Sequence, residues 1–283
     1  MKFINDCYTK DKLKLPMIHY ESLEKDICIV CVHGMCSNFL NNSFYHIWGE
    51  YVSNNNIGFI YFYNRGHDIE NDMLRNDGSI CRCGTRYEIF EESIYDIDSA
   101  VDKAISLGYK RIILLGHSYG CNKVIYYMYK RKSNISGIIL GSIPDMIGIH
   151  KLYEKDYDFL LKEAKDNIDN NKGDKLLSKL IEGYMYMSSK TYYNWYKDNS
   201  NLDNFPILNN SNNWYQFESI YVPILTFSGE LEEEYYKDFN LINEKACNAK
   251  SFSSYLIPNA NHIYEGKEEY IAKIIYKWIS EMV

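Results

Sequence analysis

One segment, residues 111–131, constrains this chain more than any other, because in it an apolar strand passes into a helix through a link of five residues. Residues 112–115 form a continuous apolar run, which is typical of a parallel strand buried on both faces. Three apolar residues then recur at helical spacing within residues 124–128. The link between them, Gly-His-Ser-Tyr-Gly at positions 116–120, must therefore reverse the chain within a very tight turn.

The turn has the Gly-x-Ser-x-Gly pattern of a nucleophile elbow, with Ser118 at its centre. Glycines flank the serine because such a turn leaves no room for side chains, while the serine hydroxyl is pushed clear of the sheet edge. The helix that follows directs its first amides and the positive end of its dipole at the same spot. The alternative is a turn serine that bonds only its own backbone. The strand before the motif and the helix after it favour a nucleophile at Ser118.

The composition limits the class of partner. The chain has 283 residues, a formal net charge of -7 and a pI of about 5.6, and its length suits one large α/β domain or such a domain with an insertion. No block of Lys or Arg stands alone, so we expect no nucleic acid or anionic membrane as partner. The amino-terminal residues lack an apolar core of signal-peptide length, and no stretch of 18 apolar residues occurs. We therefore expect a cytoplasmic protein without a membrane span.

The eight cysteines fit that compartment. Cys28 and Cys31 lie inside a predicted strand, where their spacing puts them on opposite faces, so a redox or zinc motif is not expected there. Cys81 and Cys83 lie in a predicted loop. We expect buried or incidental thiols, and no metal or organic cofactor.

Further apolar runs predict the remaining strands of a mostly parallel sheet. They lie at residues 1–8 and 13–21, which form a hairpin at the sheet edge, and at residues 27–32, 58–63, 136–140, 221–227 and 252–257. Helical stripes occupy residues 44–52, 90–104 and 270–282. This alternation predicts helices on both faces of the sheet. Residues 64–85 are mostly polar, and their apolar residues show neither helical nor strand periodicity, so we expect a long surface loop there.

The alternation stops between residues 148 and 218, where the sequence becomes polar and helical. Two apolar stripes predict helices there: Leu160, Leu161, Ala164 and Ile168, and then Leu176, Leu177, Leu180 and Ile181. We therefore expect a core of residues 1–147 and 219–283 with a helical insertion at 148–218. Residues 183–196 are dense in aromatic residues and methionine, which form either the small core of the insertion or the lining of a substrate pocket beneath a lid.

A serine hydroxyl needs a base within hydrogen-bond reach, and the base needs a third group to orient it. His262 is the best candidate for the base, because it follows the last predicted strand at the sheet edge where Ser118 should emerge. Glu232, the third residue after Gly229, is the first choice for the orienting acid, and Glu230 and Asp145 are the alternatives. For the oxyanion of an acyl-transfer intermediate we expect two backbone amides, those of Tyr119 and Met35.

Five motifs in this order resemble the α/β-hydrolase superfamily: HGM at 33–35, NRGHD at 64–68, GHSYG at 116–120, SGELE at 228–232 and NANH at 259–262. The resemblance implies an eight-stranded sheet, mostly parallel with an antiparallel second strand and flanked by helices. It also implies a helical lid inserted after the sixth strand and the triad order serine, acid, histidine. The chain departs from the family in carrying a glutamate at the acid position, where aspartate is usual, and Asn64 where many members carry aspartate.

A narrower resemblance lies around the elbow. The segment GTRYEIFEESIYDI, with GHSYGCNKVIYY after it, is similar to a group of hydrolases that includes fungal siderophore ester hydrolases. The expected function is that of a serine hydrolase that cleaves a small-molecule carboxylic ester through an acyl-enzyme, with a thioester or an amide as alternative substrates. Two other functions stay open, an acyltransferase on the same scaffold and a non-catalytic ligand-binding protein.

Overall fold

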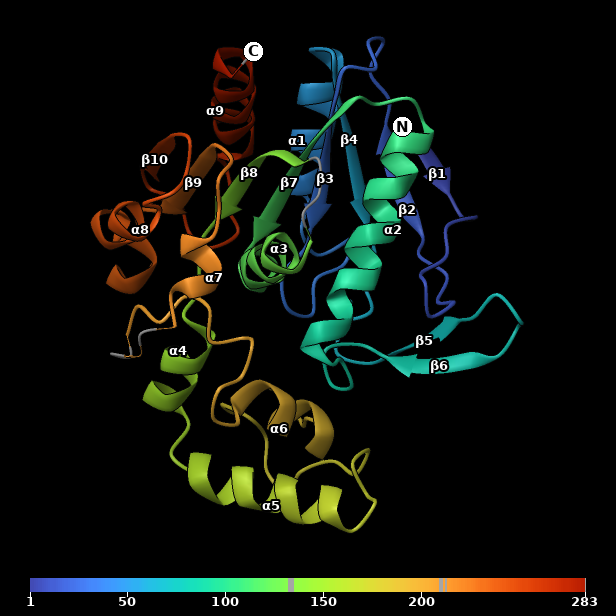
Figure 1. Ribbon diagram of the computed structural model, residues 1–283, viewed down its shortest axis with the longest axis vertical. Helices are drawn as coiled ribbons and strands as arrows, with labels where there is room; N and C mark the ends of the chain where they lie inside the picture. The colour runs from blue at the N-terminus through green and yellow to red at the C-terminus, as the bar shows by residue number, and fades with distance from the viewer. Residues whose placement is uncertain (132–134, 209–210, 212, 283) are drawn as a thin grey trace.

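The computed structural model describes residues 1–131, 135–208, 211 and 213–282, and its core is an eight-stranded sheet with the order β1-β2-β4-β3-β7-β8-β9-β10 (Figure 1). The strands are β1 (Lys2–Ile4), β2 (Met17–Tyr20), β3 (Ile27–Val32), β4 (Ile57–Phe62), β7 (Arg111–His117), β8 (Ile135–Gly141), β9 (Ile224–Gly229) and β10 (Phe252–Ile257). Strand β2 runs antiparallel to both of its neighbours, and the other pairs are parallel. The predicted sheet, mostly parallel with an antiparallel second strand, is confirmed.

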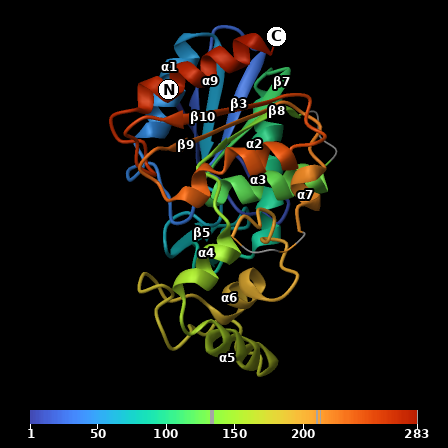
Figure 2. The same ribbon diagram turned by 90° about the vertical axis from the view of Figure 1, so that its left-hand side faces the viewer.

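Helices cover both faces of the sheet (Figure 2). They are α1 (Phe44–Asn54) and α9 (Glu268–Glu281) on one face, and α2 (Ser93–Ser106), α3 (Tyr119–Lys130) and α8 (Phe239–Lys245) on the other. Alternate residues of β3 enter different apolar clusters: Ile29 packs in the cluster of Trp48, and Val30 in the cluster of Val124. Because both faces are covered, β3 is apolar at every position, as its sequence predicts.

The predicted loop at residues 64–85 is wrong in part. It contains a two-stranded antiparallel hairpin of β5 (Asn71–Leu74) and β6 (Ile80–Cys83), so Cys81 and Cys83 lie in a strand. In these strands only Met73 and Cys83 are buried, and they pack against the main core. The other six strand residues are exposed or half-buried, and half of them are apolar, so the hairpin has no regular alternation of buried apolar and exposed polar residues by which it could be recognised.

Between β8 and β9 the chain leaves the sheet and forms α4 (Met146–Tyr153), α5 (Tyr157–Asp169), α6 (Ser189–Tyr196) and α7 (Tyr215–Glu218). Helices α4, α5 and α6 lie beyond the end of the sheet toward which β7 and β8 point (Figure 1). The predicted helix at residues 176–181 is wrong, because this stretch forms isolated bridges, Leu176 with Ser188 and Ile181 with Met185. Residues 209, 210 and 212 of the expected insertion lie outside the described residues.

Two short 3-10 turns complete the secondary structure, Phe90–Glu92 before α2 and Glu234–Lys237 after β9. Of the helices in the described ranges, none has the length and apolar character to span a bilayer.

A buried ion pair ties α3 to the segment before α2. The ammonium of Lys123 contacts the carboxylate of Glu88, and both side chains are almost fully buried. Lys123 Nζ also donates to Asn64 Oδ1 at 3.2 Å and lies 4.4 Å from the ring centroid of Tyr119. Burial raises the pKa of Glu88, and the ammonium beside it opposes that rise. The pair thus fixes the first turns of α3, which follow directly on the elbow.

We predict that Lys123→Met destabilises the protein by about 3 to 5 kcal/mol, because Glu88 is then left buried without a counter-charge. The double variant Lys123→Met/Glu88→Leu should recover most of this loss. Urea unfolding at pH 7 measures both free energies. Lys165→Met, which removes an exposed partner of Asp169, is the matched control and should cost less than about 1 kcal/mol. Equal losses in the single and double variants would contradict the prediction.

Candidate active site

Ser118 lies in a strained backbone conformation at the end of β7. Its φ is 54° and its ψ is -130°, in a region that non-glycine residues rarely adopt, and it is the N-cap residue of α3. The flanking glycines are required by contact: a Cβ at Gly120 would lie 2.1 Å from the carbonyl oxygen of Val32, and one at Gly116 would lie 2.7 Å from the nitrogen of Cys121. The turn is thus as tight as its sequence predicts.

The loop after β3 passes directly beside this serine. A Cβ at Gly34 would lie 3.1 Å from Ser118 Cβ and 3.6 Å from Ser118 Oγ. Met35, the next residue, lines the same cavity as Ser118. As the first residue of α3, Tyr119 has an amide without a partner inside the helix. The backbones of Met35 and Tyr119, which the sequence suggests as oxyanion donors, therefore flank Ser118.

His262 and Glu232 form a direct hydrogen bond. Nδ1 of His262 lies 2.6 Å from Oε1 of Glu232, whose side chain is only 2% exposed. The other carboxylate oxygen, Oε2, accepts hydrogen bonds from Ser142 Oγ at 2.8 Å and from the N–H of Gly229. Because a carboxylate only accepts, Nδ1 of His262 carries a proton, and Nε2 is left as the basic nitrogen.

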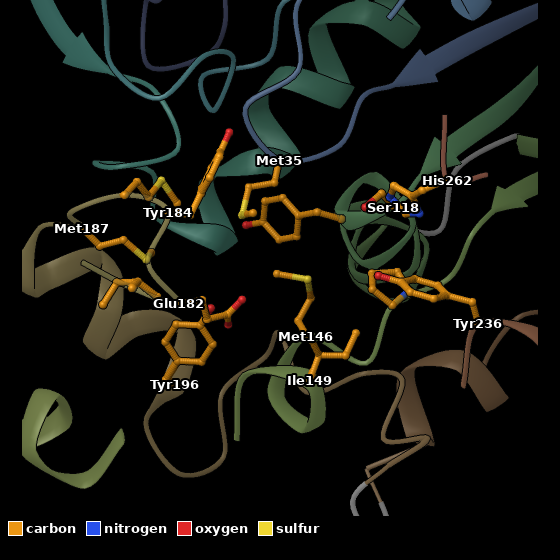
Figure 3. Close-up of a pocket in the computed structure, with 14 residues that line it drawn as sticks. Met35, Ser118, Met146, Ile149, Glu182, Tyr184, Met187, Tyr196, Tyr236 and His262 are labelled. Atoms are coloured by element: carbon orange, nitrogen blue, oxygen red, sulfur yellow. The ribbon is translucent and has the colours of Figure 1, made fainter. Parts of the chain in front are cut away.

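Ser118 and His262 lie side by side at one end of a cavity (Figure 3). In the described part of the chain no hydrogen bond joins the Ser118 hydroxyl to the His262 ring, and such bonds often form only when substrate binds. The three residues that the sequence suggests for catalysis are nonetheless brought to one place, at the carboxyl ends of the strands.

The two alternative acids are engaged elsewhere. Glu230 Oε2 accepts a hydrogen bond from the N–H of Asn259 at 2.8 Å. Asp145 caps α4 by accepting from the N–H of Gly148 and also accepts from the N–H of Leu208, both at 2.7 Å. The contact geometry therefore favours Glu232 as the partner of the histidine.

Sequence reasoning missed the residues that support this pair. Ser142, which bonds Glu232, has a positive φ of 52° at the end of β8, and its hydroxyl also bonds the hydroxyl of Tyr264. His117 Nε2 donates to the backbone oxygen of His262 at 2.9 Å. The only signal in the sequence is position, because all of these residues stand at or just after the carboxyl end of a parallel strand.

His117 and His33 are both buried histidines beside the site. Burial lowers the pKa of each ring well below its ordinary value. His33 accepts the N–H of Asn64 at Nε2 (3.2 Å), and its Nδ1 lies 2.8 Å from the oxygen of Gly34. Both rings are therefore neutral: His33 supports the loop after β3, and His117 supports the loop that carries His262.

The cavity beside Ser118 has a volume of about 220 Å³ and is lined by residues from the core and from the helical segment after β8 (Figure 3). The lining is mostly apolar or aromatic: Met35, Tyr119, Pro144, Met146, Ile149, Ile181, Tyr184, Met185, Met187, Tyr196 and Tyr236, together with Ser118, Glu182 and His262. Within the described ranges, no cluster of three or more potential metal ligands occurs. The arrangement can raise the nucleophilicity of a serine by proton transfer to histidine.

Comparison with known proteins places this geometry in context. The profile of the family described as "Protein of unknown function (DUF1749)" matches residues 92–283. A search of curated proteins found no significant match. Est1E from Butyrivibrio proteoclasticus, solved with ferulic acid, is 15% identical, with a TM-score of 0.66 over 100% of this chain and 99% of its own.

Two further solved structures have the same fold. A soluble variant of monoglyceride lipase from Saccharomyces cerevisiae, in complex with a substrate analogue, is 13% identical, with a TM-score of 0.66 over 100% of this chain and 96% of its own. DcsB, in complex with its substrate analogue, is 12% identical, with a TM-score of 0.72 over 100% and 99%. At such identities the likeness shows the fold alone.

We predict that His117 makes the fold sensitive to acid. Its pKa is lowered in the folded chain, so below about pH 6.5 the unfolded chain binds a proton that the folded chain does not, and stability falls as the pH falls. In His117→Gln the drop in the free energy of unfolding between pH 7.5 and 5.5 should be smaller than in wild type by about 1.4 kcal/mol. Urea unfolding at both pH values measures this, and an unchanged drop would contradict it.

We predict that Glu232→Gln slows covalent labelling of Ser118 by a fluorophosphonate about 10² to 10⁴-fold, because the amide cannot stabilise a charged His262. Glu230→Gln is the matched control, two residues before Glu232 in the chain, and should label at nearly the wild-type rate. Mass spectrometry measures the labelling rates of both variants and of the wild type. If Glu230→Gln is the slower of the two, the assignment of the acid is wrong.

Proposed function

The chain belongs to the family described as DUF1749, and from this premise and its α/β-hydrolase fold we propose that it is a serine hydrolase that cleaves a carboxylic ester through an acyl-enzyme. The observation that carries the proposal is the bond between His262 Nδ1 and Glu232 Oε1, formed beside a serine at a strained elbow. A histidine oriented in this way has its second nitrogen available for the serine proton.

In the proposed reaction Ser118 Oγ attacks the ester carbonyl while His262 Nε2 takes its proton. Glu232 stabilises the imidazolium that results, and the N–H groups of Met35 and Tyr119 bind the oxyanion. The imidazolium then protonates the leaving alcohol, whose departure gives the acyl-enzyme. Water, deprotonated by His262, releases the acid and restores Ser118.

The character of the cavity supports an ester of a small molecule as substrate. Its methionines and tyrosines offer apolar contacts to an acyl chain or an aromatic acid. An ester has no N–H that would require an acceptor from the apolar side chains beside Ser118, which favours it over an amide. The esterase and lipase with the same fold are consistent with this substrate class.

We propose that the helical segment at residues 148–218 is a lid on this cavity. Several cavity residues come from it, among them Ile149, Met187 and Tyr196. When such a lid closes over a bound substrate, it keeps water away from the amides that bind the oxyanion. We also propose a cytoplasmic location, which the eight unpaired thiols support.

We predict that the purified protein hydrolyses 4-nitrophenyl esters and that Ser118→Ala lowers kcat about 10⁴ to 10⁶-fold, because the nucleophile is removed. Ser280→Ala on α9 is the matched control and should retain wild-type kcat, since this exposed serine donates its hydroxyl to the carbonyl of Tyr276 in its own helix. Release of nitrophenol measures both rates.

Trapping of the acyl-enzyme separates the three candidate functions. Mass spectrometry after rapid acid quench should find the acyl group on Ser118 of the wild type. Faster nitrophenol release with an added alcohol, together with the alcohol's ester as product, would favour an acyltransferase. Absence of both hydrolysis and fluorophosphonate labelling would favour a non-catalytic binding protein.

A further inference from the structure

One carboxylate faces the otherwise apolar cavity. Of the 14 residues that line it, all within the described part of the chain, Glu182 alone carries a carboxylate. Glu182 and Tyr196 lie across the cavity from Ser118 and His262 (Figure 3). The proposed reaction does not use Glu182. Its position therefore calls for a separate explanation.

Glu182 is held in place from several sides. Its φ is 50°, which is strained for a residue with a side chain, and Gly183 follows it. The N–H of Glu182 donates to Glu154 Oε2 at 2.9 Å, and its Oε1 lies 2.7 Å from Nδ1 of His150. His150 is buried, and its ring stacks on Tyr196 with the centroids 3.8 Å apart. The carboxylate is thus braced by a packed aromatic group.

His150 is the hydrogen-bond partner of the Glu182 carboxylate. Because a carboxylate only accepts, Nδ1 of His150 carries a proton, and its Nε2 lies 3.0 Å from the hydroxyl of Tyr192. In the ranges that the structure describes, no lysine or arginine forms an ion pair with Glu182. Glu154, which bonds its amide, adds a second negative charge nearby.

A carboxylate among aromatic and methionine side chains is the combination that binds a cationic nitrogen. Tyr184 and Tyr196 line the same side of the cavity as Glu182 (Figure 3), and the faces of such rings attract cations. A neutral acyl chain that filled this end would strip water from the carboxylate without replacing its hydrogen bonds, which disfavours it. The site therefore favours a cationic ligand in two ways: the carboxylate and the aromatic rings attract it, and the desolvation of the carboxylate disfavours a neutral apolar ligand in its place.

We propose that the substrate is an ester that carries an ammonium group away from its scissile carbonyl, and that Glu182, braced by His150, is the residue that selects it. This inference rests on the proposed function in that it takes the substrate to be an ester. The ammonium belongs to the acyl part or to the alcohol part, and matched probes distinguish the two.

Two isosteric pairs test the inference, each differing only in charge. On the acyl side, 4-nitrophenyl 6-aminohexanoate is compared with 4-nitrophenyl heptanoate, and on the alcohol side acetylcholine with 3,3-dimethylbutyl acetate. Wild type should show a higher kcat/KM for the cationic member of at least one pair. For the aminohexanoate pair, Glu182→Gln should lower the ratio of cationic to neutral kcat/KM about ten- to a hundredfold, the range for a hydrogen bond to a charged partner. Acetylcholine has no N–H to donate, so in its pair the ratio should fall through the loss of charge attraction alone.

The glutamine variant removes the charge and keeps the contact, because its amide oxygen can still accept from His150 Nδ1. A lower ratio of cationic to neutral kcat/KM in Glu182→Gln therefore shows that the carboxylate recognises charge. If Glu182 only held its loop in place, the substitution would leave this ratio unchanged. Glu163→Gln is the matched control, since Glu163 lies outside the cavity and bonds Ser178. Its ratio should equal that of wild type.

Binding to the Ser118→Ala variant separates this inference from the proposed function, because it requires no turnover. Calorimetry should find the cationic member of one pair bound at least tenfold more tightly, and Glu182→Gln in the same background should abolish the difference. Equal affinities in both pairs, or a preference that survives Glu182→Gln, would overturn the inference. Hydrolysis of the neutral esters would still support the proposed function.

Discussion

The backbone of Ser118 is the constraint on which the other features of the site depend. At φ 54° it costs free energy on the order of 1 to 3 kcal/mol, and the contacts of Gly116 and Gly120 show that nothing larger could stand beside it. The packing of β3, β7 and α3 holds it there. Because the turn is so tight, the serine, the first amide of α3 and the loop at Gly34 all meet at one point of the sheet edge.

The electrostatics of the site follow from how its groups are buried. Burial lowers the pKa of His33 and His117, so these rings are neutral supports, whereas Nδ1 of His262 donates a hydrogen bond to the carboxylate of Glu232. The carboxylate of Glu232 is itself held by Ser142 and Gly229, so it is fixed before any substrate binds. Donors and acceptors arranged in advance need no reorganisation during the reaction, which is the main source of electrostatic catalysis.

Much of this could be predicted from the sequence because its strongest signals are local. Apolar runs define the central strands, and the elbow, His262 and Glu232 stand at strand ends, which a parallel sheet brings to one edge. Two predictions were wrong because the structure there depends on tertiary contacts. The β5–β6 hairpin buries only Met73 and Cys83 of its strand residues, and residues 176–181 form bridges to residues 185–188 instead of a helix. Ser142, His117 and Glu182 have no sequence signature, because their roles come from neighbours distant along the chain.

The central claim is that Ser118, His262 and the amides of Met35 and Tyr119 form one catalytic unit. The most direct test is a crystal structure of the protein after reaction with a fluorophosphonate. The account predicts phosphorus bonded to Ser118 Oγ, a phosphoryl oxygen about 3 Å from both amide nitrogens, and His262 Nε2 within hydrogen-bond distance of the adduct. An adduct on another residue, or a phosphoryl oxygen turned away from both amides, would contradict it.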